Sequence, residues 1–142
     1  MGYTLLEIII VLAIIAILTT LAVTNYSDQI SHQQLRDASS GLVGQLRLAR
    51  QKAISSGTKE TISFNPQLRQ YSDVSLGTQT TLPGNVDFGD ITFVGNSATF
   101  RSDGTGEMGT LYLTNSKNES VKITVNITGR VRKFLWNGQT WE

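Results

Sequence analysis

The sequence predicts an α+β fold in which a long N-terminal helix packs on a small antiparallel β-sheet domain. Three observations support this prediction: an uncharged apolar run near the N-terminus, an apolar stripe at helical spacing after it, and short alternating segments separated by turn residues over the rest of the chain. We expect three parts, which are the apolar half of the helix (1–27), its amphipathic half (28–57) and a C-terminal β domain (58–142).

The first part has the length and the composition of a membrane helix. No residue from Ile8 to Ser27 is charged, a stretch of 20 residues. At about 1.5 Å per residue this helix would be about 30 Å long, which matches the hydrocarbon core of a bilayer. Nothing basic precedes the run, and the helical pattern continues past it, so we expect a retained membrane helix rather than a cleaved secretory signal.

The helical pattern continues beyond Asp28 and becomes amphipathic. Apolar residues recur three or four positions apart and form one stripe: Leu35, Ala38, Leu42, Leu46, Ala49 and Ala53. Most of the basic residues lie off this stripe: Arg36, Arg47, Arg50 and Lys52. No proline precedes Pro66, and Ser55-Ser56-Gly57 is a plausible helix end, so the pattern predicts one helix of roughly 50 residues.

Beyond Thr58 the hydrophobic period shortens to two. Seven segments are predicted to be strands: 58–65, 70–76, 90–94, 98–101, 110–114, 120–127 and 130–136. Asn137-Gly138 is a strong signal for a two-residue type I′ hairpin turn. The stripe of the helix is the only available cover for the apolar face of the resulting sheet.

The composition argues against an enzyme and against a metal protein. There is no cysteine and only one histidine, His32, which we expect on the polar stretch of the helix and exposed to solvent. Gly104, Gly106 and Gly109 match a G-x-G-x-x-G pattern, but a strand follows them, so we expect a hairpin turn and no dinucleotide site. Asp103 and Glu107 do not have the spacing of a calcium loop, so no metal and no cofactor are expected.

Glu7 is a carboxylate placed directly before the apolar run. Thr4 and Glu7 have the spacing of a capping box, in which Thr4 caps the helix and Glu7 reaches back to the Thr4 amide. The carboxylate would also face the positive end of the helix dipole. A helix cap is therefore the ordinary explanation of this charge.

The N-terminal segment GYTLLEIIIVLAIIAIL resembles the prepilin motif of the type IV pilin superfamily. The resemblance implies that a prepilin peptidase cuts after Gly2 and that Tyr3 becomes the N-methylated mature N-terminus. It also implies that Glu7 pairs with the N-terminal amine of a neighbouring subunit during filament assembly. This role explains the charge better than a cap alone, because the carboxylate is buried only where a partner arrives.

The C-terminal half resembles the GspH/FimT family of minor pilins and pseudopilins. The similarity lies in ATFRSDGTGEMGTLYLTN and SVKITVNITGRVRKF, in which a strand, a Gly-rich turn and a strand precede a Gly-Arg-x-Arg segment. That segment is Gly129-Arg130-Val131-Arg132 here. The resemblance implies one of two branches, which are pilus proteins that aid DNA uptake in natural transformation and pseudopilins of type II secretion.

The charged residues from Lys117 to the C-terminus are mostly basic, with five cations (Lys117, Lys122, Arg130, Arg132 and Lys133) and two acids (Glu119 and Glu142). Such a patch suits contact with DNA phosphates, although a charged strand that resists aggregation is the more ordinary explanation from composition alone. The match to Gly-Arg-x-Arg favours DNA binding, with Arg130 and Arg132 central, Lys133 assisting, and Lys117 and Lys122 less involved. Gly129 would supply the turn that aims them. We expect the helix cations to form a polar face or to contact neighbouring subunits.

The favoured function is therefore a minor type IV pilin that is assembled into a pilus and binds double-stranded DNA through its basic C-terminal segment for uptake in natural transformation. The alternative is a GspH-like pseudopilin with a structural role and no DNA binding. Expected partners are other pilin or pseudopilin subunits, the prepilin peptidase and the inner membrane. The chain would cross that membrane once before it joins a pilus or pseudopilus that extends to the periplasm or the cell surface.

Overall fold

The computed structural model describes residues 4–136 and 138–142, apart from the side chains of residues 20–28. The chain divides into two compact units, Met1–Ile30 and Ser31–Glu142. Both contain part of one helix, α1 (Leu5–Ser56), and the second unit also contains all the strands. The 52 residues of α1 agree with the prediction of roughly 50.

The two ends of α1 are formed by the residues that the sequence indicates. At its start the Thr4 hydroxyl oxygen accepts a hydrogen bond from the Glu7 backbone N–H at 3.3 Å, which is the Thr4 half of a capping box. At its end Gly57 has a φ of 68°, the left-handed conformation that glycine adopts without strain after a helix. The predicted stop at Ser55-Ser56-Gly57 is confirmed.

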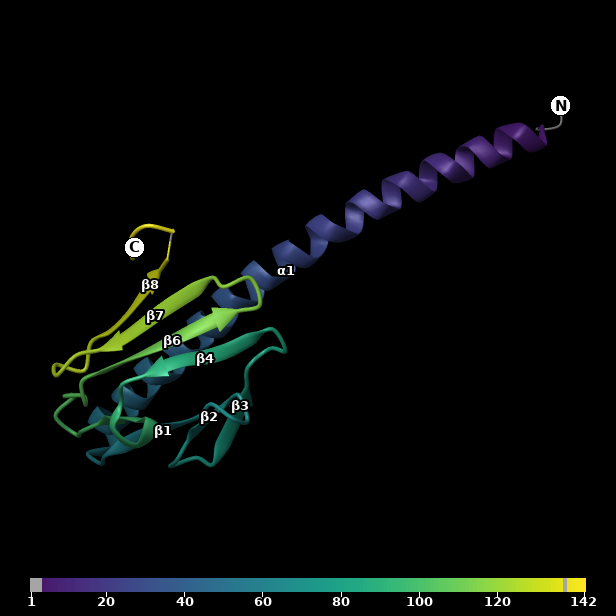
Figure 1. Cartoon of the computed structure of the whole chain (residues 1–142). Coiled ribbons are helices and arrows are strands. Elements are labelled where there is room, and N and C mark those ends of the chain that lie inside the picture. The colour runs from purple at the N-terminus through teal and green to yellow at the C-terminus, as the bar shows by residue number, and fades with distance from the viewer. Residues whose placement is uncertain (1–3, 137) are drawn as a thin grey trace. The chain divides into compact units, whose positions relative to one another are not determined.

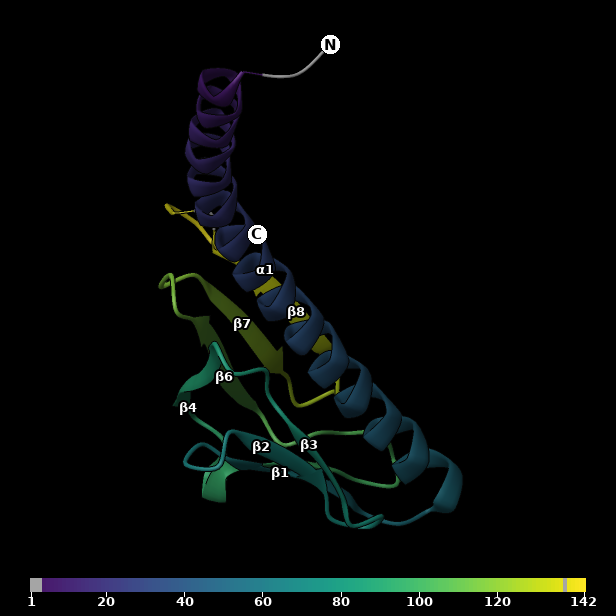
Figure 2. The same ribbon diagram turned by 90° about the vertical axis from the view of Figure 1, so that its right-hand side faces the viewer.

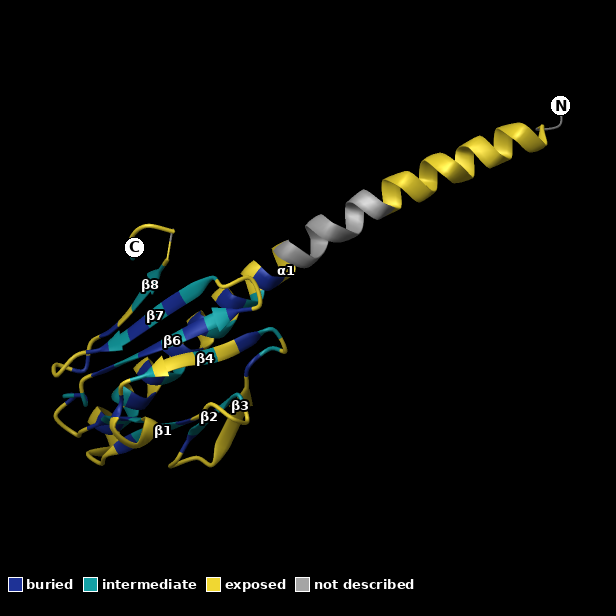
Figure 3. Ribbon diagram, in the orientation of Figure 1, coloured by how far each residue is buried: buried dark blue, intermediate teal, exposed yellow. Residues whose placement is uncertain are grey.

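The helix in the first unit exposes its apolar side chains, as Figure 3 shows for residues 5–18. Leu5, for example, is 76% exposed. The Thr19 hydroxyl donates to the backbone carbonyls of Ile15 and Ala16 at 3.0 Å, so this polar group is satisfied within the helix. Gly2 and Tyr3, the predicted processing residues, lie outside the described residues.

No helix within the described residues is both long and apolar enough to cross a membrane.

The second unit contains two four-stranded antiparallel sheets, where the sequence predicted one small sheet (Figure 1). The first sheet has the order β3-β2-β1-β5 and the second the order β4-β6-β7-β8. Their strands are β1 (Glu60–Asn65), β2 (Gln70–Asp73), β3 (Thr78–Thr81), β4 (Val86–Ile91), β5 (Ser97–Phe100), β6 (Gly109–Asn115), β7 (Ser120–Val125) and β8 (Val131–Leu135). A short 3₁₀ turn, η1 (Val94–Asn96), separates β4 from β5. The chain therefore leaves the first sheet at β4, returns to it at β5 and ends in the second sheet.

Three local predictions were wrong, and a fourth was confirmed in part. Strand β3 was missed because Thr78–Thr81 carries no apolar alternation and is exposed throughout. Strand β4 ends at Ile91, so the predicted strand over 90–94 is instead the end of β4 followed by a turn. The glycine-rich segment 104–109 begins in the predicted hairpin turn, since Phe100 pairs with Gly106 and the Arg101 N–H donates to the Thr105 carbonyl at 2.9 Å. It then crosses from β5 of one sheet to β6 of the other. At the C-terminus Trp136 pairs with Trp141, which is not the register of a two-residue turn; residue 137 itself lies outside the described residues.

The apolar stripe of α1 lies in the core of the second unit, as predicted. Leu42, Leu46 and Ala53 are fully buried, and Leu35 and Ala49 are nearly so. Alternate residues of both sheets complete this core: Ile62, Phe64, Ala98 and Phe100 from the first sheet, and Leu111, Leu113, Val121, Ile123 and Val125 from the second. Figure 2 shows α1 running along the face of β7 and β8. One helix face thus supplies the cover that neither sheet has alone.

A charged cluster links the helix to the first sheet. The Lys52 ammonium is 3.0 Å from Oδ2 of Asp73 and 3.7 Å from Oε2 of Glu60, and both carboxylates are nearly inaccessible to solvent. Burial raises the pKa of Asp73, but hydrogen bonds from Ser75, Lys52 and the Leu76 backbone N–H outweigh it and hold this pKa below its ordinary value. Lys52 is thus a structural cation that joins α1 to β1 and β2.

We expect Asp73→Asn to lower the free energy of unfolding at pH 7 by about 2 kcal/mol, because a charge-assisted hydrogen bond to Lys52 is removed. The lowered pKa of Asp73 means that its contribution is present above the unfolded-state pKa, about pH 4, and is lost as the pH falls through the folded-state pKa. Urea unfolding should therefore show a difference in unfolding free energy between Asp73→Asn and the original chain that is smaller at pH 3 than at pH 7. Asp37→Asn, an exposed control, should change little at either pH. A pH-independent difference for Asp73→Asn would contradict the assignment.

Candidate functional site

The predicted Gly-Arg-x-Arg segment begins in a tight turn between β7 and β8. The Asn126 side-chain oxygen accepts hydrogen bonds from the Arg130 backbone N–H and the Thr128 hydroxyl, each at 2.8 Å. The Gly129 N–H donates to the Asn126 carbonyl, also at 2.8 Å. Because β8 begins at Val131, Arg130 belongs to this turn and Arg132 to the strand. The turn is therefore held by hydrogen bonds among its own residues, and the Arg130 side chain is exposed to solvent.

Only glycine fits at position 129. Its φ is 72°, and a Cβ built there would overlap the Gly104 carbonyl oxygen and crowd the Arg50 side chain. The Arg50 Nε donates to the Gly104 carbonyl at 2.9 Å, and Nη2 donates to the Thr128 carbonyl at 3.2 Å. Arg50 thus ties α1 to two turns, and Gly129 leaves the space through which its guanidinium passes.

A pocket of about 350 Å³ opens between this turn and α1. It is lined by Arg47, Arg50 and Gln51 from the helix and by Gly129, Arg130 and Val131 from the turn and β8. Arg50 and Gln51 lie three and four positions after Arg47, so each of them neighbours Arg47 on the helix surface. None of the lining side chains is acidic, and three of them are arginines. The arrangement is suited to holding an anion.

Arg132 and Lys133 do not line this pocket. Arg132 is exposed and lies opposite Thr124 of β7. The Lys133 ammonium donates to the Ser40 hydroxyl of α1 at 2.9 Å, so it is bound to the helix. The structure therefore brings Arg130 together with Arg47 and Arg50 rather than with Lys133.

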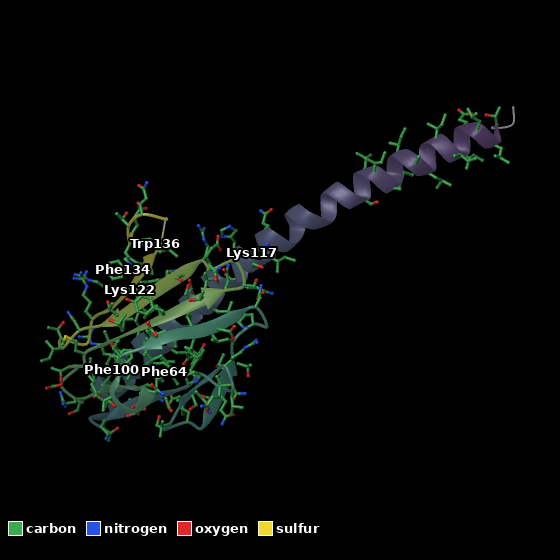
Figure 4. All side chains as sticks on the ribbon, viewed as in Figure 1. Phe64, Phe100, Lys117, Lys122, Phe134 and Trp136 are labelled. Atoms are coloured by element: carbon green, nitrogen blue, oxygen red, sulfur yellow. The ribbon has the colours of Figure 1, made fainter. Side chains whose placement is uncertain are left out.

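The two lysines with a lesser predicted role lie elsewhere, one on β7 and one in the β6–β7 turn (Figure 4). Lys122 of β7 stands 5.9 Å from the ring centre of Trp141. Trp141 in turn packs against Trp136, its antiparallel pairing partner, with ring centres 5.1 Å apart. The Lys117 backbone N–H donates to the Asn115 side chain within the β6–β7 turn. Neither lysine lines the pocket.

His32 is exposed, as predicted, and its Nδ1 lies 2.8 Å from a Glu119 carboxylate oxygen. Within the described parts of the chain, no group of three or more His, Cys, Asp or Glu side chains is placed to hold a metal ion.

The contribution of the helix to the site was missed by sequence reasoning. Arg47, Arg50 and Gln51 have a spacing that indicates a shared helix face, but the same spacing describes any polar face. The missing information was the position of the β7–β8 turn against that face, which depends on how the sheet packs on α1.

The fold and the exposed apolar helix define a pilin-like filament subunit, and comparison with known proteins specifies the family. Residues 38–129 match the model of the type II transport protein GspH family. The chain is 32% identical to a fimbrial protein of Pseudomonas aeruginosa over 96% of this chain and 82% of that protein. It is 30% identical to the type II secretion system protein H of Xanthomonas campestris pv. campestris over 92% of this chain and 81% of that protein.

Two solved structures have the same fold. The minor pseudopilin EpsH of Vibrio cholerae has a TM-score of 0.60 at 17% identity, over 72% of this chain and 97% of that chain. The type IV minor pilin FimU of Pseudomonas aeruginosa has a TM-score of 0.61 at 15% identity, over 78% of this chain and 94% of that chain.

The chain belongs to the GspH family, and its similarity to FimT-like minor pilins and pseudopilins is confirmed. Its relatives are pilins and pseudopilins rather than enzymes, which points to a non-enzymatic role in a pilus or a type II secretion filament. Membership of this family also implies association with other pilin-type subunits. The family match ends at Gly129, directly before the first arginine of the pocket turn.

We expect Gly129→Ala to lower the free energy of unfolding by about 2 kcal/mol or more, because it adds both a strained φ and an overlap with Gly104 and Arg50. Gly57→Ala is the matched control: its φ of 68° is similar, but nothing lies within 4 Å of the new Cβ. Urea unfolding should show the larger decrease for Gly129→Ala. Equal decreases would mean that backbone conformation alone accounts for the glycine.

Proposed function

We propose that this protein is a minor type IV pilin that binds double-stranded DNA for uptake in natural transformation. The observation that carries the proposal is the placement of Arg130, whose side chain stands in a rigid turn beside two further arginines and no acid. Phosphate contacts of this kind give binding that depends on salt and hardly on base sequence. Such binding suits a protein that must capture DNA of any sequence.

The remaining predicted residues have graded roles in this proposal. Arg132 is exposed on β8 close to Arg130 in sequence and supplies a second phosphate contact. Lys133 assists less than the two arginines because its ammonium is already bound to Ser40. Lys122, which is packed against Trp141, and Lys117 add positive potential at a distance from the pocket.

The N-terminal unit is proposed to assemble the filament. We infer processing between Gly2 and Tyr3, N-methylation of Tyr3, and pairing of Glu7 with the N-terminal amine of a neighbouring subunit. Support comes from the prepilin-like motif and from the exposed apolar side chains of residues 5–18, which require either lipid or other subunits as cover. Before assembly, residues 1–27 would anchor the chain in the inner membrane, while residues 28–57 and 58–142 form the exported domain.

We expect Glu7→Ala to fold normally but to be depleted from purified filaments by about tenfold, because a buried amine without its carboxylate is strongly disfavoured. The measurement is quantitative immunoblotting of sheared filaments against whole cells. Thr4→Ala, which removes the helix cap and keeps the charge, is the control and should retain assembly. Normal incorporation of Glu7→Ala would exclude the pairing role.

We expect the full chain in a non-ionic detergent to bind duplex DNA with an affinity that falls steeply with salt. Replacing both Arg130 and Arg132 by Gln should weaken binding at least tenfold and make the slope of log K against log salt shallower by about 0.9 for each phosphate that is no longer neutralised. The control pair, Arg36→Gln with Lys59→Gln, removes the same charge from exposed positions that do not line the pocket.

The same titration distinguishes the alternative function. A GspH-like pseudopilin with a structural role should show no DNA binding, or only binding whose affinity both variant pairs lower to the same extent. A filament-level control is needed for weak binding, because repeated subunits raise avidity without any new contact.

A further inference from the structure

We propose that the pocket between α1 and the β7–β8 turn holds a single phosphate of the DNA backbone, with Arg47 and Gln51 of the helix as direct ligands beside Arg130. This inference rests on the proposed DNA binding and adds a helical half to a site that the sequence placed only in the C-terminal segment. It also gives Arg47, which was expected to lie on a polar helix face or to contact neighbouring subunits, a role in binding.

The first support is the grouping of the three arginines. Arg50 is bound to the carbonyls of Gly104 and Thr128. In the described part of the chain, neither the Arg47 nor the Arg130 side chain forms a hydrogen bond or an ion pair. Two unpaired guanidinium groups therefore line one pocket beside a third that is fixed, and no acidic side chain lines it to offset their like charges. Bound anionic oxygens would offset these charges.

The second support is the match between donors and ligand. Guanidinium groups bind phosphate oxygens with two parallel N–H donors, and the Gln51 amide supplies further donors from the next helical turn. A volume of about 350 Å³ exceeds what one phosphate group requires and leaves room for an adjoining deoxyribose. The pocket is therefore suited to a phosphodiester within a chain.

The third support is preorganisation. Arg50 has more N–H donors than its two carbonyl bonds use, and those bonds fix the position of its charge. Arg50 is thus a positioning residue that holds the turn carrying Arg130 against the helix turn carrying Arg47. The ligand would meet two backbone segments that are already held together, so only the side chains of Arg47 and Arg130 need to be ordered on binding.

The test uses the full chain in non-ionic detergent, a duplex DNA of about 20 base pairs, and the variants Arg47→Gln, Arg130→Gln and the double variant. We expect each single change to weaken binding about tenfold. Since both arginines hold the same phosphate, the double variant should reduce the salt slope by about 0.9, the value for one phosphate, and not by about 1.8. Arg36→Gln, an exposed arginine on the same helix outside the pocket, is the matched control and should change binding least.

The outcomes separate this inference from the proposed function. Unchanged binding by Arg47→Gln, together with weakened binding by the Arg130/Arg132 pair, would overturn the shared pocket while DNA binding stands. A slope change in the double variant that corresponds to two phosphates would place the two arginines on separate phosphates and overturn it as well. A second titration, with inorganic phosphate and with the unfolding midpoint as its readout, tests whether the bound phosphate belongs to DNA or is a free anion. Stabilisation by phosphate without any DNA binding would assign the pocket to a free anion and overturn both proposals.

Discussion

Burial of one face of α1 is the constraint on which the rest of the second unit depends. The stripe from Leu35 to Ala53 supplies apolar cover for both sheets, and each sheet alone would leave a hydrophobic face exposed. Because the stripe fixes the rotation of the helix, it also decides where the neighbouring polar positions point. Arg47, Arg50 and Gln51 lie beside the stripe and meet the β7–β8 turn, so packing of the core builds one wall of the pocket.

The second wall depends on the contact between Arg50 and Gly129. A glycine at this position serves the turn through its positive φ, and it also lets the Arg50 side chain reach the Gly104 and Thr128 carbonyls. The Gly-Arg-x-Arg segment therefore has a structural part and an exposed part. Gly129 allows the helix and the turn to approach closely, whereas the side chains of Arg130 and Arg132 remain exposed. This division explains how a rigid turn can present exposed, charged side chains.

Local signals in the sequence predicted the elements whose residues interact along the chain. The stripe predicted α1, Gly57 its end, and alternation most of the strands, because period and turn chemistry act within a few residues. They did not predict the division into two sheets, since β5 pairs with β1 across more than thirty residues and nothing local specifies that choice. For the same reason the sequence indicated Arg130 but not its neighbours Arg47 and Gln51, which reach the pocket only through tertiary packing.

The two units meet different physical requirements of a filament subunit. The apolar helix requires many copies or a lipid environment, while the second unit buries its own core and keeps Arg47, Arg130 and Arg132 exposed. A pocket for one phosphate gives modest affinity that salt weakens, because counterion release supplies most of the binding energy. Repetition of that pocket along a filament would turn later contacts into intramolecular ones and raise the total affinity without a larger site. Under the proposed function, a small cationic pocket repeated along a filament would be sufficient to retain a long polyanion, while each single contact would stay weak.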